Sequence, residues 1–305
     1  MKKVTLAALA IVIAIAVTAF VATHYDRLPE QSNFALDLEH IKKLIHNDTD
    51  LPIGIGSLSV AGGEFPGCLV VTGCGEGPYA LDVRAFQLQY ASGDNIIIDP
   101  PHDKALNDAN AILMKWFDQA AYDRVQEAML QAQKIVFTHE HFDHIGGVIK
   151  SPNLPELAEK IVINTAQQAN AEQANLSYPQ IVRDLKAIDY DTYYHLAPGV
   201  VLIKATGHTP GAQMIFVRMA NGEEVLFAGD TAWNKVNILQ EKSKPLLANW
   251  AAGEDGVALA HQIRSLIEIH KKGEVTVLLA HDVDWLQAYE QRGLLQADIR
   301  LEESK

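Results

Sequence analysis

The hydrophobic pattern of the chain begins with one continuous apolar block. Two lysines precede 19 uncharged, mostly apolar residues at positions 4–22. This length is just enough to span a bilayer, and lysines before an apolar span are typical of its cytoplasmic side. A cleaved signal peptide has a similar layout, with residues 17–19 as a tolerable cleavage site. Residues 1–26 are therefore predicted to be a signal peptide or a membrane anchor. Both interpretations export the rest of the chain to the periplasm, either released or tethered to the inner membrane through residues 4–22.

The pattern after this block predicts a linker and then a large domain. Within residues 27–53, apolar side chains at helical spacing (Leu38, Ile41, Leu44 and Ile45) predict a short amphipathic helix after a polar linker. From residue 54 to 99, short β-prone runs such as "IGIGSLSVAGG", "CLVVTG" and "NIIIDP" are split by Gly, Asp and Asn. These runs predict a sheet of short strands at the start of a domain that covers residues 54–305.

The second part of this domain alternates between helical and strand patterns. Residues 105–119 have a helical pattern, and strands such as "KIVFT", "VVLIKAT" and "EVTVLLA" follow with helical segments between them. Interleaved strands and helices indicate the α/β class. If the early and late groups of strands separate, the domain has two facing sheets.

Charge and cysteine content narrow the range of partners. The 305-residue chain has a formal net charge of −13, which disfavours nucleic acid and leaves a small-molecule substrate as the expected partner. An exported protein can pair its two cysteines, Cys68 and Cys74. A straight strand would hold them too far apart, whereas a turn near Thr72 and Gly73 would bring them together. A disulfide and two separate thiols both stay open, and the oligomeric state is not indicated.

Potential metal ligands are concentrated in one stretch, "FTHEHFDHIGG", which follows an apolar strand. Side chains two positions apart point to the same side of an extended backbone, so His139 and His141 can reach one point in space. Asp143 and His144 come next, where the chain turns at two glycines, and can reach a second point. Because a zinc ion needs three or four protein ligands, two ions require further ligands from elsewhere in the chain.

Three further candidates each follow a predicted strand. His208 comes after "VVLIKATG", Asp230 after "EEVLFAG" and His281 after "EVTVLLA". Ligands at the carboxyl ends of neighbouring strands converge on one rim of an α/β protein. Singly, each residue has a plainer interpretation, such as a surface histidine or a helix cap. The ordered set of seven ligands is what predicts a metal site.

The motifs "THEHFDH", "GHTPG", "FAGD" and "LLAH", with "NIIIDP" upstream, resemble those of the metallo-β-lactamase superfamily over roughly residues 54–290. The resemblance implies an αββα sandwich, in which two facing mixed β-sheets are flanked by helices and the metals lie at one edge. It implies that His139, His141 and His208 bind a first metal and that Asp143, His144 and His281 bind a second. Asp230 would bridge the two metals. It also implies that Asp99 lies beneath the ligands and holds one imidazole by a hydrogen bond; a plain turn residue is the alternative.

The resemblance and the ligand set together predict a hydrolase with two Zn²⁺ ions per chain. Two such cations share a water and lower its pKa, and the resulting bridging hydroxide attacks a small ester, lactone or related carbonyl compound. Asp143 and Asp230 are the carboxylates predicted to act in catalysis. Five histidines and an open site favour zinc over iron or manganese. A β-lactam or phosphodiester hydrolase of the same fold is one alternative, and a catalytically silent metal-binding protein is another.

Trp233 marks a departure from one branch of the family. Quorum-quenching lactonases match the ligand set but have a tyrosine three residues after the bridging aspartate, where this chain has Trp233. An indole cannot hydrogen-bond a substrate carbonyl as a phenol does, which argues against acyl-homoserine-lactone specificity. Because the chain that leaves Asp230 cannot travel far in three residues, Trp233 is predicted to line the substrate pocket; core packing is the alternative.

Overall fold

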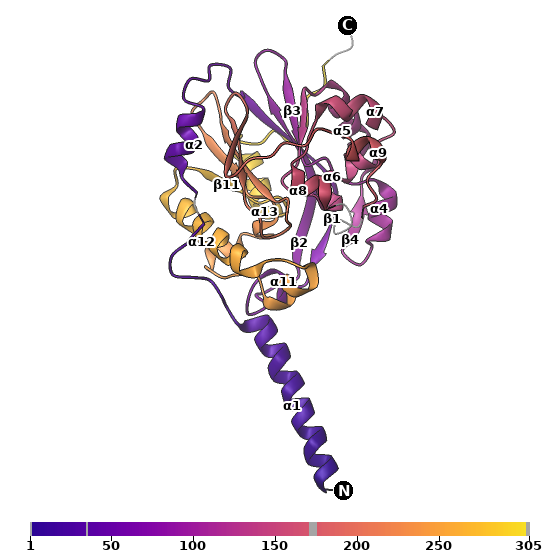
Figure 1. The fold of residues 1–305 in the computed structure, drawn as a ribbon, viewed down its shortest axis with the longest axis vertical. Coiled ribbons are helices and arrows are strands. Elements are labelled where there is room, and N and C mark those ends of the chain that lie inside the picture. Colours follow the sequence, from indigo (N-terminus) through magenta and orange to yellow (C-terminus); the bar gives the residue numbers. More distant parts are fainter. Residues whose placement is uncertain (1, 35, 171–175, 303–305) are drawn as a thin grey trace.

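The structure, a computed structural model, describes residues 2–34, 36–170 and 176–302. Within this part of the chain the strands form two sheets (Figure 1). The first sheet has the order β4-β1-β2-β3-β5-β6, with bounds Met114–Phe117, Gly54–Phe65, Tyr79–Gln89, Asn95–Ile98, Lys134–Val136 and Ile161–Val162. The second has the order β11-β10-β9-β8-β7, with bounds Thr276–Leu278, Glu224–Phe227, Gln213–Arg218, Val200–Lys204 and Tyr193–Ala197. The early and late strands therefore separate into two sheets, as the sequence predicted.

Both sheets are mixed. In the first sheet β3, β5 and β6 run parallel to one another, and β1 pairs antiparallel with both β2 and β4. In the second sheet β10 and β11 are parallel, while β7, β8, β9 and β10 pair antiparallel in turn. The parallel pairs bring the ends of β3 and β5 together in one sheet and the ends of β10 and β11 together in the other.

Helices cover the outer face of each sheet. Helices α5 (Gln119–Gln131), α6 (Phe142–Ile149) and α7 (Leu154–Leu157) pack on the first sheet, and α2 (Leu38–Leu44) and α12 (Gly256–Lys272) pack on the second. The other helices of the domain are α3 (Gly67–Val70), α4 (Lys104–Ala109), α8 (Thr165–Ala169), α9 (Gln180–Arg183), α10 (Val236–Leu239), α11 (Leu246–Ala252), α13 (Val283–Gln291) and the 3₁₀ turns η1 (Ala158–Lys160) and η2 (Gly229–Thr231).

The apolar strands are buried on both faces, and this burial holds the layers together. In β3, Ile96 and Ile98 pack between the sheets, whereas Ile97 packs under the helices of the first sheet. Alternate residues of a strand point to opposite faces, so a continuous apolar run suits a strand covered on both sides. Phe86 and Phe227 meet across the inner core with ring centroids 5.2 Å apart. The result is the predicted αββα sandwich.

The predicted helix over residues 105–119 is only partly correct. Helix α4 ends at Ala109, and Met114–Phe117 form strand β4 at the edge of the first sheet. The strand pairs with β1 beside Gly62, where an added Cβ would lie 2.5 Å from the indole of Trp116. Glycine at this position lets the Trp116 ring lie against the neighbouring strand, and this tertiary pairing outweighs the local helical pattern.

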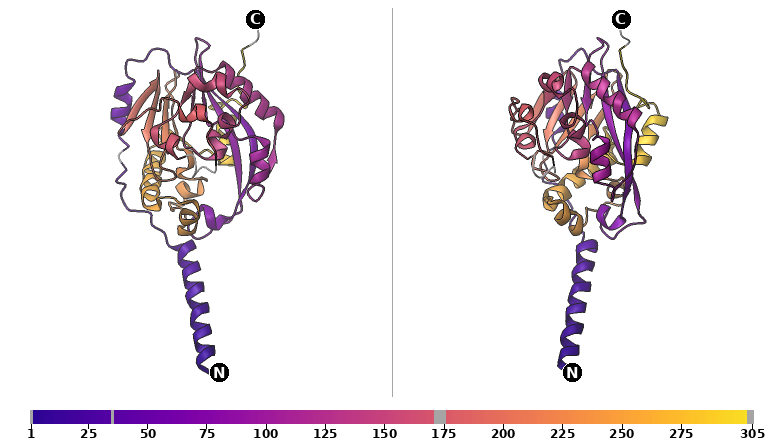
Figure 2. Two further views of the ribbon diagram at one scale, coloured as in Figure 1. Left: turned by 45° about the vertical axis from the view of Figure 1, so that its right-hand side comes forward. Right: turned by 90° about the vertical axis from the view of Figure 1, so that its right-hand side faces the viewer.

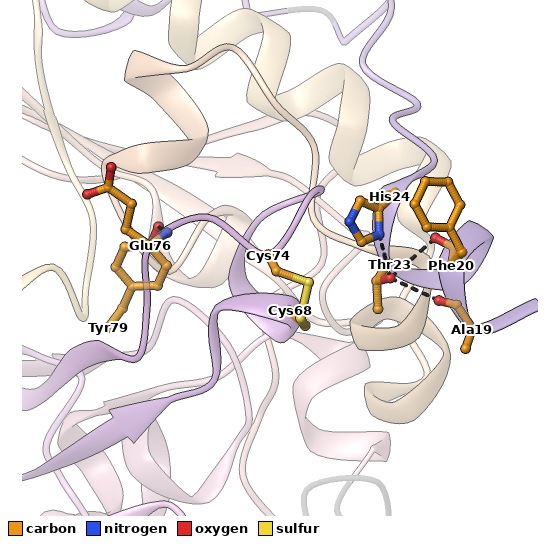
Figure 3. The surroundings of a disulfide bond; sticks show 8 residues. All are labelled: Ala19, Phe20, Thr23, His24, Cys68, Cys74, Glu76 and Tyr79. Carbon is orange, nitrogen blue, oxygen red and sulfur yellow. Dashed lines mark hydrogen bonds between the residues drawn. A yellow bond between two sulfur atoms is a disulfide. The ribbon is translucent and has the colours of Figure 1, made fainter. Parts of the chain in front are cut away.

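The segment "CLVVTG" is not a strand, and Cys68 and Cys74, at its start and just after its end, are not separate thiols. Cys68 and Cys74 form a disulfide, which closes a loop made of α3 and a turn (Figure 3). The turn has positive φ angles at Gly73, Cys74 and Gly75. A Cβ on Gly67 would lie 1.9 Å from the carbonyl oxygen of Cys74, so glycine is what allows the two ends of the loop to meet.

Helix α1 (Lys2–His24) projects from one end of the domain (Figures 1 and 2). Its stretch Ala7–His24 is long and apolar enough to cross a membrane by length and composition, and none of that stretch is buried. Among the described residues it is the one helix with this property. A signal sequence passes the same test, so an anchor and a signal peptide both stay predictions.

Candidate metal centre

The seven predicted ligands lie together at one edge of the sandwich, each shortly after the end of a strand. His139 and His141 follow β5, Asp143 and His144 lie in the first turn of α6, and His208 follows β8. Asp230 lies in η2 after β10, and His281 follows β11. Because β10 and β11 are parallel neighbours, their ends place Asp230 beside His281.

Three imidazoles form the first cluster. His139 Nε2 lies 3.1 Å from His141 Nδ1, and His208 Nε2 lies 3.2 Å and 2.9 Å from these two nitrogens. Ligand atoms bound about 2.0–2.1 Å from a tetrahedral zinc ion lie about 3.3 Å from one another. The three ring nitrogens therefore have nearly the spacing of three ligands that share one ion.

The second cluster lies next to His139, whose ring centroid is 3.9 Å from that of His144. His144 Nε2 and His281 Nε2 are 3.2 Å apart. Asp143 Oδ2 lies 3.7 Å from His144 Nε2 and 3.5 Å from His281 Nε2. Asp143 and His144 come from the first turn of α6, which follows β5, and His281 comes from the end of β11, so elements that follow both sheets contribute to the cluster.

Asp230 lies between the two clusters and turns one oxygen toward each. Its Oδ2 is 3.3 Å from His208 Nε2, and its Oδ1 is 3.0 Å from His281 Nε2 and 3.4 Å from His144 Nε2. Oδ1 is buried and has no hydrogen-bond partner of suitable geometry among the described residues. Since buried carboxylate oxygens are normally satisfied, this oxygen is suited to a cation between the imidazoles.

The electrostatics of the site also suit cations. Burial lowers the pKa of His139 well below its usual range and lowers the pKa of His141 to about 3, so both rings are held in the neutral form that binds metals. Burial opposes protonation of His208 and His281 as well, but Asp230 outweighs it and raises the pKa of both. A set of five imidazoles and two carboxylates fits two divalent metal ions.

Asp99 lies beneath His144. Its Oδ2 accepts hydrogen bonds from His144 Nδ1 at 2.9 Å and from the Thr138 hydroxyl at 2.6 Å, and its Oδ1 accepts from the Thr138 amide at 2.6 Å. The φ angle of Asp99 is +51°, an uncommon value for a residue with a side chain. This contact places the proton of His144 on Nδ1 and leaves Nε2 to face the cluster. The predicted hydrogen bond to an imidazole is present, and its part in metal binding stays a prediction.

His281 is oriented by the backbone of β2. Its Nδ1 donates to the carbonyl oxygen of Asp82 at 2.6 Å, and the Asp82 amide donates back to the His281 carbonyl at 3.2 Å. Nε2 of His281 therefore faces His144. This contact could not be predicted from the sequence, because every residue has a backbone carbonyl and the residue type does not indicate which one accepts the hydrogen bond.

His208 is oriented by a buried ion pair that the sequence did not indicate. Glu254 Oε1 accepts a hydrogen bond from His208 Nδ1 at 2.6 Å and also pairs with Lys244 Nζ. The side chains of Glu254 and Lys244 are 0% and 1% exposed. Burial opposes the ionisation of Glu254, but Lys244 and the hydrogen bond from His208 outweigh it and lower the pKa of Glu254 to about 2.

Glu140, between two predicted ligands, is a second support that the sequence did not indicate. It points away from the neighbouring imidazoles and is fully buried. Its two oxygens accept hydrogen bonds from the Thr209 hydroxyl at 2.7 Å and from the Gly211 amide at 3.1 Å. Glu140 thus ties the histidine-rich loop to the loop that holds His208.

Trp233 lies beside the first cluster and is half-buried. Its Nε1 donates to Asp230 Oδ2 at 2.7 Å. Its ring stacks on Phe65 with centroids 4.5 Å apart, and Lys244 Nζ lies 3.7 Å from the ring centre. The indole N–H is therefore already engaged by Asp230, and the role of Trp233 as a pocket wall stays a prediction.

Comparison with known proteins gives the same family as the motifs. A family profile described as "Metallo-beta-lactamase superfamily" matches residues 88–281. The N-acyl homoserine lactonase AiiA of Bacillus thuringiensis subsp. kurstaki is 29% identical over 150 residues, which are 49% of this chain and 56% of the relative. The N-acyl homoserine lactonase AttM of Rhizobium radiobacter is 24% identical over 178 residues, or 55% of this chain and 65% of the relative. The chain thus matches a little over half the length of these curated relatives.

Solved structures share the fold at low sequence identity. An N-acyl homoserine lactone hydrolase with the product N-hexanoyl-L-homoserine at its catalytic metal center is 19% identical, with a TM-score of 0.60 over 78% of this chain and 96% of that chain. A probable metal-dependent hydrolase from Staphylococcus aureus is 16% identical, with a TM-score of 0.55 over 77% and 91%. With the profile match over most of the sandwich and the convergent imidazoles and carboxylates, these findings place the chain in the metallo-beta-lactamase superfamily, as a metal-dependent hydrolase of that fold.

Proposed function

We propose that the protein binds two zinc ions and hydrolyses a small lactone or a related ester. The observation that supports this most directly is the Asp230 carboxylate, which presents one oxygen to each histidine cluster. A bridging carboxylate between two three-ligand clusters is the arrangement that a two-metal site needs. In this proposal His139, His141 and His208 bind the first ion, and Asp143, His144 and His281 bind the second.

The protein's own contribution is to hold these donors in fixed positions. Asp99, Glu254 and the Asp82 carbonyl each accept the Nδ1 hydrogen of one imidazole and direct its Nε2 into the site. Ligands held in this way lose little freedom when a metal binds, which raises affinity. Two bound zinc ions would lower the pKa of a shared water and polarise the substrate carbonyl. Among the ligands, Asp143 and Asp230 are the two carboxylates that we expect to act in catalysis.

Lactones are the preferred substrate class because of the relatives. AiiA and AttM, which match about half of this chain, are N-acyl homoserine lactonases. Trp233 argues that recognition of the substrate carbonyl differs from theirs. Its N–H donates to Asp230, so it is not free to hydrogen-bond a substrate carbonyl in the manner of a phenol. We therefore expect ring opening of lactones, without specificity for acyl-homoserine lactones.

A substrate panel tests the proposal. Full-length protein in detergent, loaded with zinc, is assayed against lactones of different ring size and acyl length, simple esters, a chromogenic β-lactam and a phosphodiester. The expected result is fastest turnover of one or more lactones, lost on chelation and in Asp230→Asn. Turnover of the β-lactam or the phosphodiester alone would contradict the lactonase assignment, and no metal-dependent turnover of any kind would contradict hydrolysis altogether.

A further inference from the structure

Helix α11 presents an exposed aromatic side chain at the end of the domain from which α1 emerges. Figures 1 and 2 place α11 on that end in each view, and the two helices are in contact. Trp250 of α11 is 83% exposed. The sequence of the helix, "LLANWAA", contains no charged residue. A single exposed apolar side chain is common on protein surfaces, so Trp250 becomes informative only through its position beside α1.

The end of α1 is fixed to the domain without a free linker. The Gly73 amide, inside the disulfide-bonded loop, donates to the Thr23 carbonyl at 2.8 Å, and Figure 3 shows the disulfide near this last turn of α1. Asp26 Oδ1 accepts hydrogen bonds from the Ser243 amide at 3.1 Å and from its hydroxyl at 2.7 Å. Arg27 donates to the Asn249 side chain on α11. The position of α11 relative to the end of α1 is therefore set by the fold.

The length of α1 locates this end of the domain relative to a bilayer. A helix of 23 residues is about 34 Å long, slightly more than the roughly 30 Å hydrocarbon core of a membrane. If α1 spans the bilayer, His24 lies at its surface, and the domain that is attached directly after it lies against the headgroups. Tryptophan is enriched at that depth because its ring is apolar and its N–H is polar.

We propose that α1 is a retained anchor and that α11 rests in the headgroup region of the bilayer that α1 spans, with Trp250 inserted. The partner is the lipid surface itself. Electrostatic attraction does not bring the domain there, because a chain with a net charge of −13 is not attracted to an anionic lipid surface. Instead, α1 holds the domain next to the lipid surface. Because α11 has no charged side chain, its contact with the lipids does not require a charge to be removed from water.

This placement also brings the metal centre close to the membrane. Arg27 donates to Asn249, the Asn249 amide donates to Glu254 Oε2 at 2.7 Å, and Glu254 accepts from His208 at 2.6 Å. Three hydrogen bonds thus connect the end of the anchor with a predicted metal ligand. This second step rests on the proposed function: the substrate would be an amphiphilic lactone whose acyl chain partitions into the bilayer beside the site.

Fluorescence quenching by brominated lipids tests the contact. Full-length protein is reconstituted in phosphatidylcholine vesicles with acyl chains brominated near the headgroup. The chain has four tryptophans and α1 has none, so quenching reports on the domain alone. Trp250→Phe should remove most of the quenching. The matched control is Trp116→Phe, which removes an indole that is 45% exposed on β4 and should leave the quenching unchanged.

Three results would overturn the proposed contact. The first is no quenching in the wild-type protein, and the second is quenching that persists in Trp250→Phe. The third is an intact mass below that of the 33.5 kDa full chain for protein extracted from membranes, which would mean that α1 is removed. If a second copy covered α11 instead, Trp250 would be shielded from bromine and the detergent-solubilised protein would be a dimer that Trp250→Asp dissociates.

A kinetic comparison tests the substrate step separately. In vesicles, Trp250→Asp should lower kcat/KM several-fold for a long-acyl lactone that partitions into the bilayer, and leave a water-soluble short-acyl lactone unaffected. Equal values for wild type and variant on the long-acyl lactone would refute membrane delivery. If neither lactone is hydrolysed by either protein, the proposed lactonase function fails while the quenching result still decides the lipid contact.

Discussion

Replacing Glu254 by glutamine isolates the contribution of the ion pair that supports His208. The variant keeps the size of the side chain and an oxygen that His208 Nδ1 can reach, but removes the negative charge. In the wild type that charge faces the imidazole at 2.6 Å and also neutralises Lys244, in surroundings where both side chains are at most 1% exposed. Residues that hold a metal-binding histidine in this way typically contribute about 10–100-fold to affinity or activity. We therefore expect zinc to bind about 10–100-fold more weakly, which corresponds to about 1.4–2.7 kcal/mol.

The same change should also destabilise the fold, because Lys244 is left buried without a counter-charge. Breaking a buried ion pair by removing one partner costs about 3–5 kcal/mol, or a decrease in Tm of roughly 6–20 °C for a domain of this size. Burial would raise the pKa of Glu254, but Lys244 and His208 lower it to about 2 from an ordinary value of 4.5. Its stabilisation is thus fully present above pH 4.5 and is lost as the pH falls toward 2. The stability difference between wild type and variant should narrow only in that acidic range.

A matched variant separates metal binding from stability. Glu224 is 9% exposed and pairs with Lys42 at 2.9 Å, but it lies at the start of β10, at the opposite end of that strand from Asp230. Glu224→Gln should lower Tm and leave zinc affinity unchanged. Competition with a chromophoric chelator measures affinity, and thermal melts of the metal-free proteins measure stability. Equal zinc affinity for wild type and Glu254→Gln, despite a lower Tm, would show that Glu254 serves only to neutralise Lys244.

Three further predictions follow from the site. Elemental analysis of protein purified without chelator should give close to two metal ions per chain, and a value of one that zinc loading does not raise would exclude two-ion binding. His144→Ala, which removes a ligand that Asp99 holds, should lower turnover by orders of magnitude in a folded protein, and unaltered kcat would exclude that role. Trp233→Phe removes the hydrogen bond to Asp230 but keeps the stack on Phe65, so kcat should fall with little change in Tm; a large fall in Tm with unchanged kinetics would assign Trp233 to the core.

The arrangement of the layers and the grouping of the ligand candidates could be predicted because both depend on local patterns. The loop after β5 and the first turn of α6 bring four candidate ligands together within six residues, and the positions of His208, Asp230 and His281 follow from the rule that parallel strands end at one rim. Elements that depend on a distant partner were harder to predict. Residues 114–117 form a strand because Gly62 of β1 accommodates Trp116, and the loop from Cys68 to Cys74 closes because Gly67 leaves room for it.

Glu254 shows why the support of a metal site is harder to predict than its ligands. It lies in "AAGEDGV", where Gly253 ends α11 in a left-handed conformation and Asp255 caps α12 through the amides of Val257 and Ala258. Every neighbour of Glu254 is thus explained by helix termination and capping, and the glutamate itself looks like a solvated loop residue. Its partners, His208 and Lys244, are 46 and 10 positions away, and only the fold brings them into contact. A metal ligand can be recognised in the sequence because it is a histidine or an aspartate that follows a strand. The group that orients the ligand can be any hydrogen-bond acceptor that the fold places beside it, including a backbone carbonyl such as that of Asp82 beneath His281.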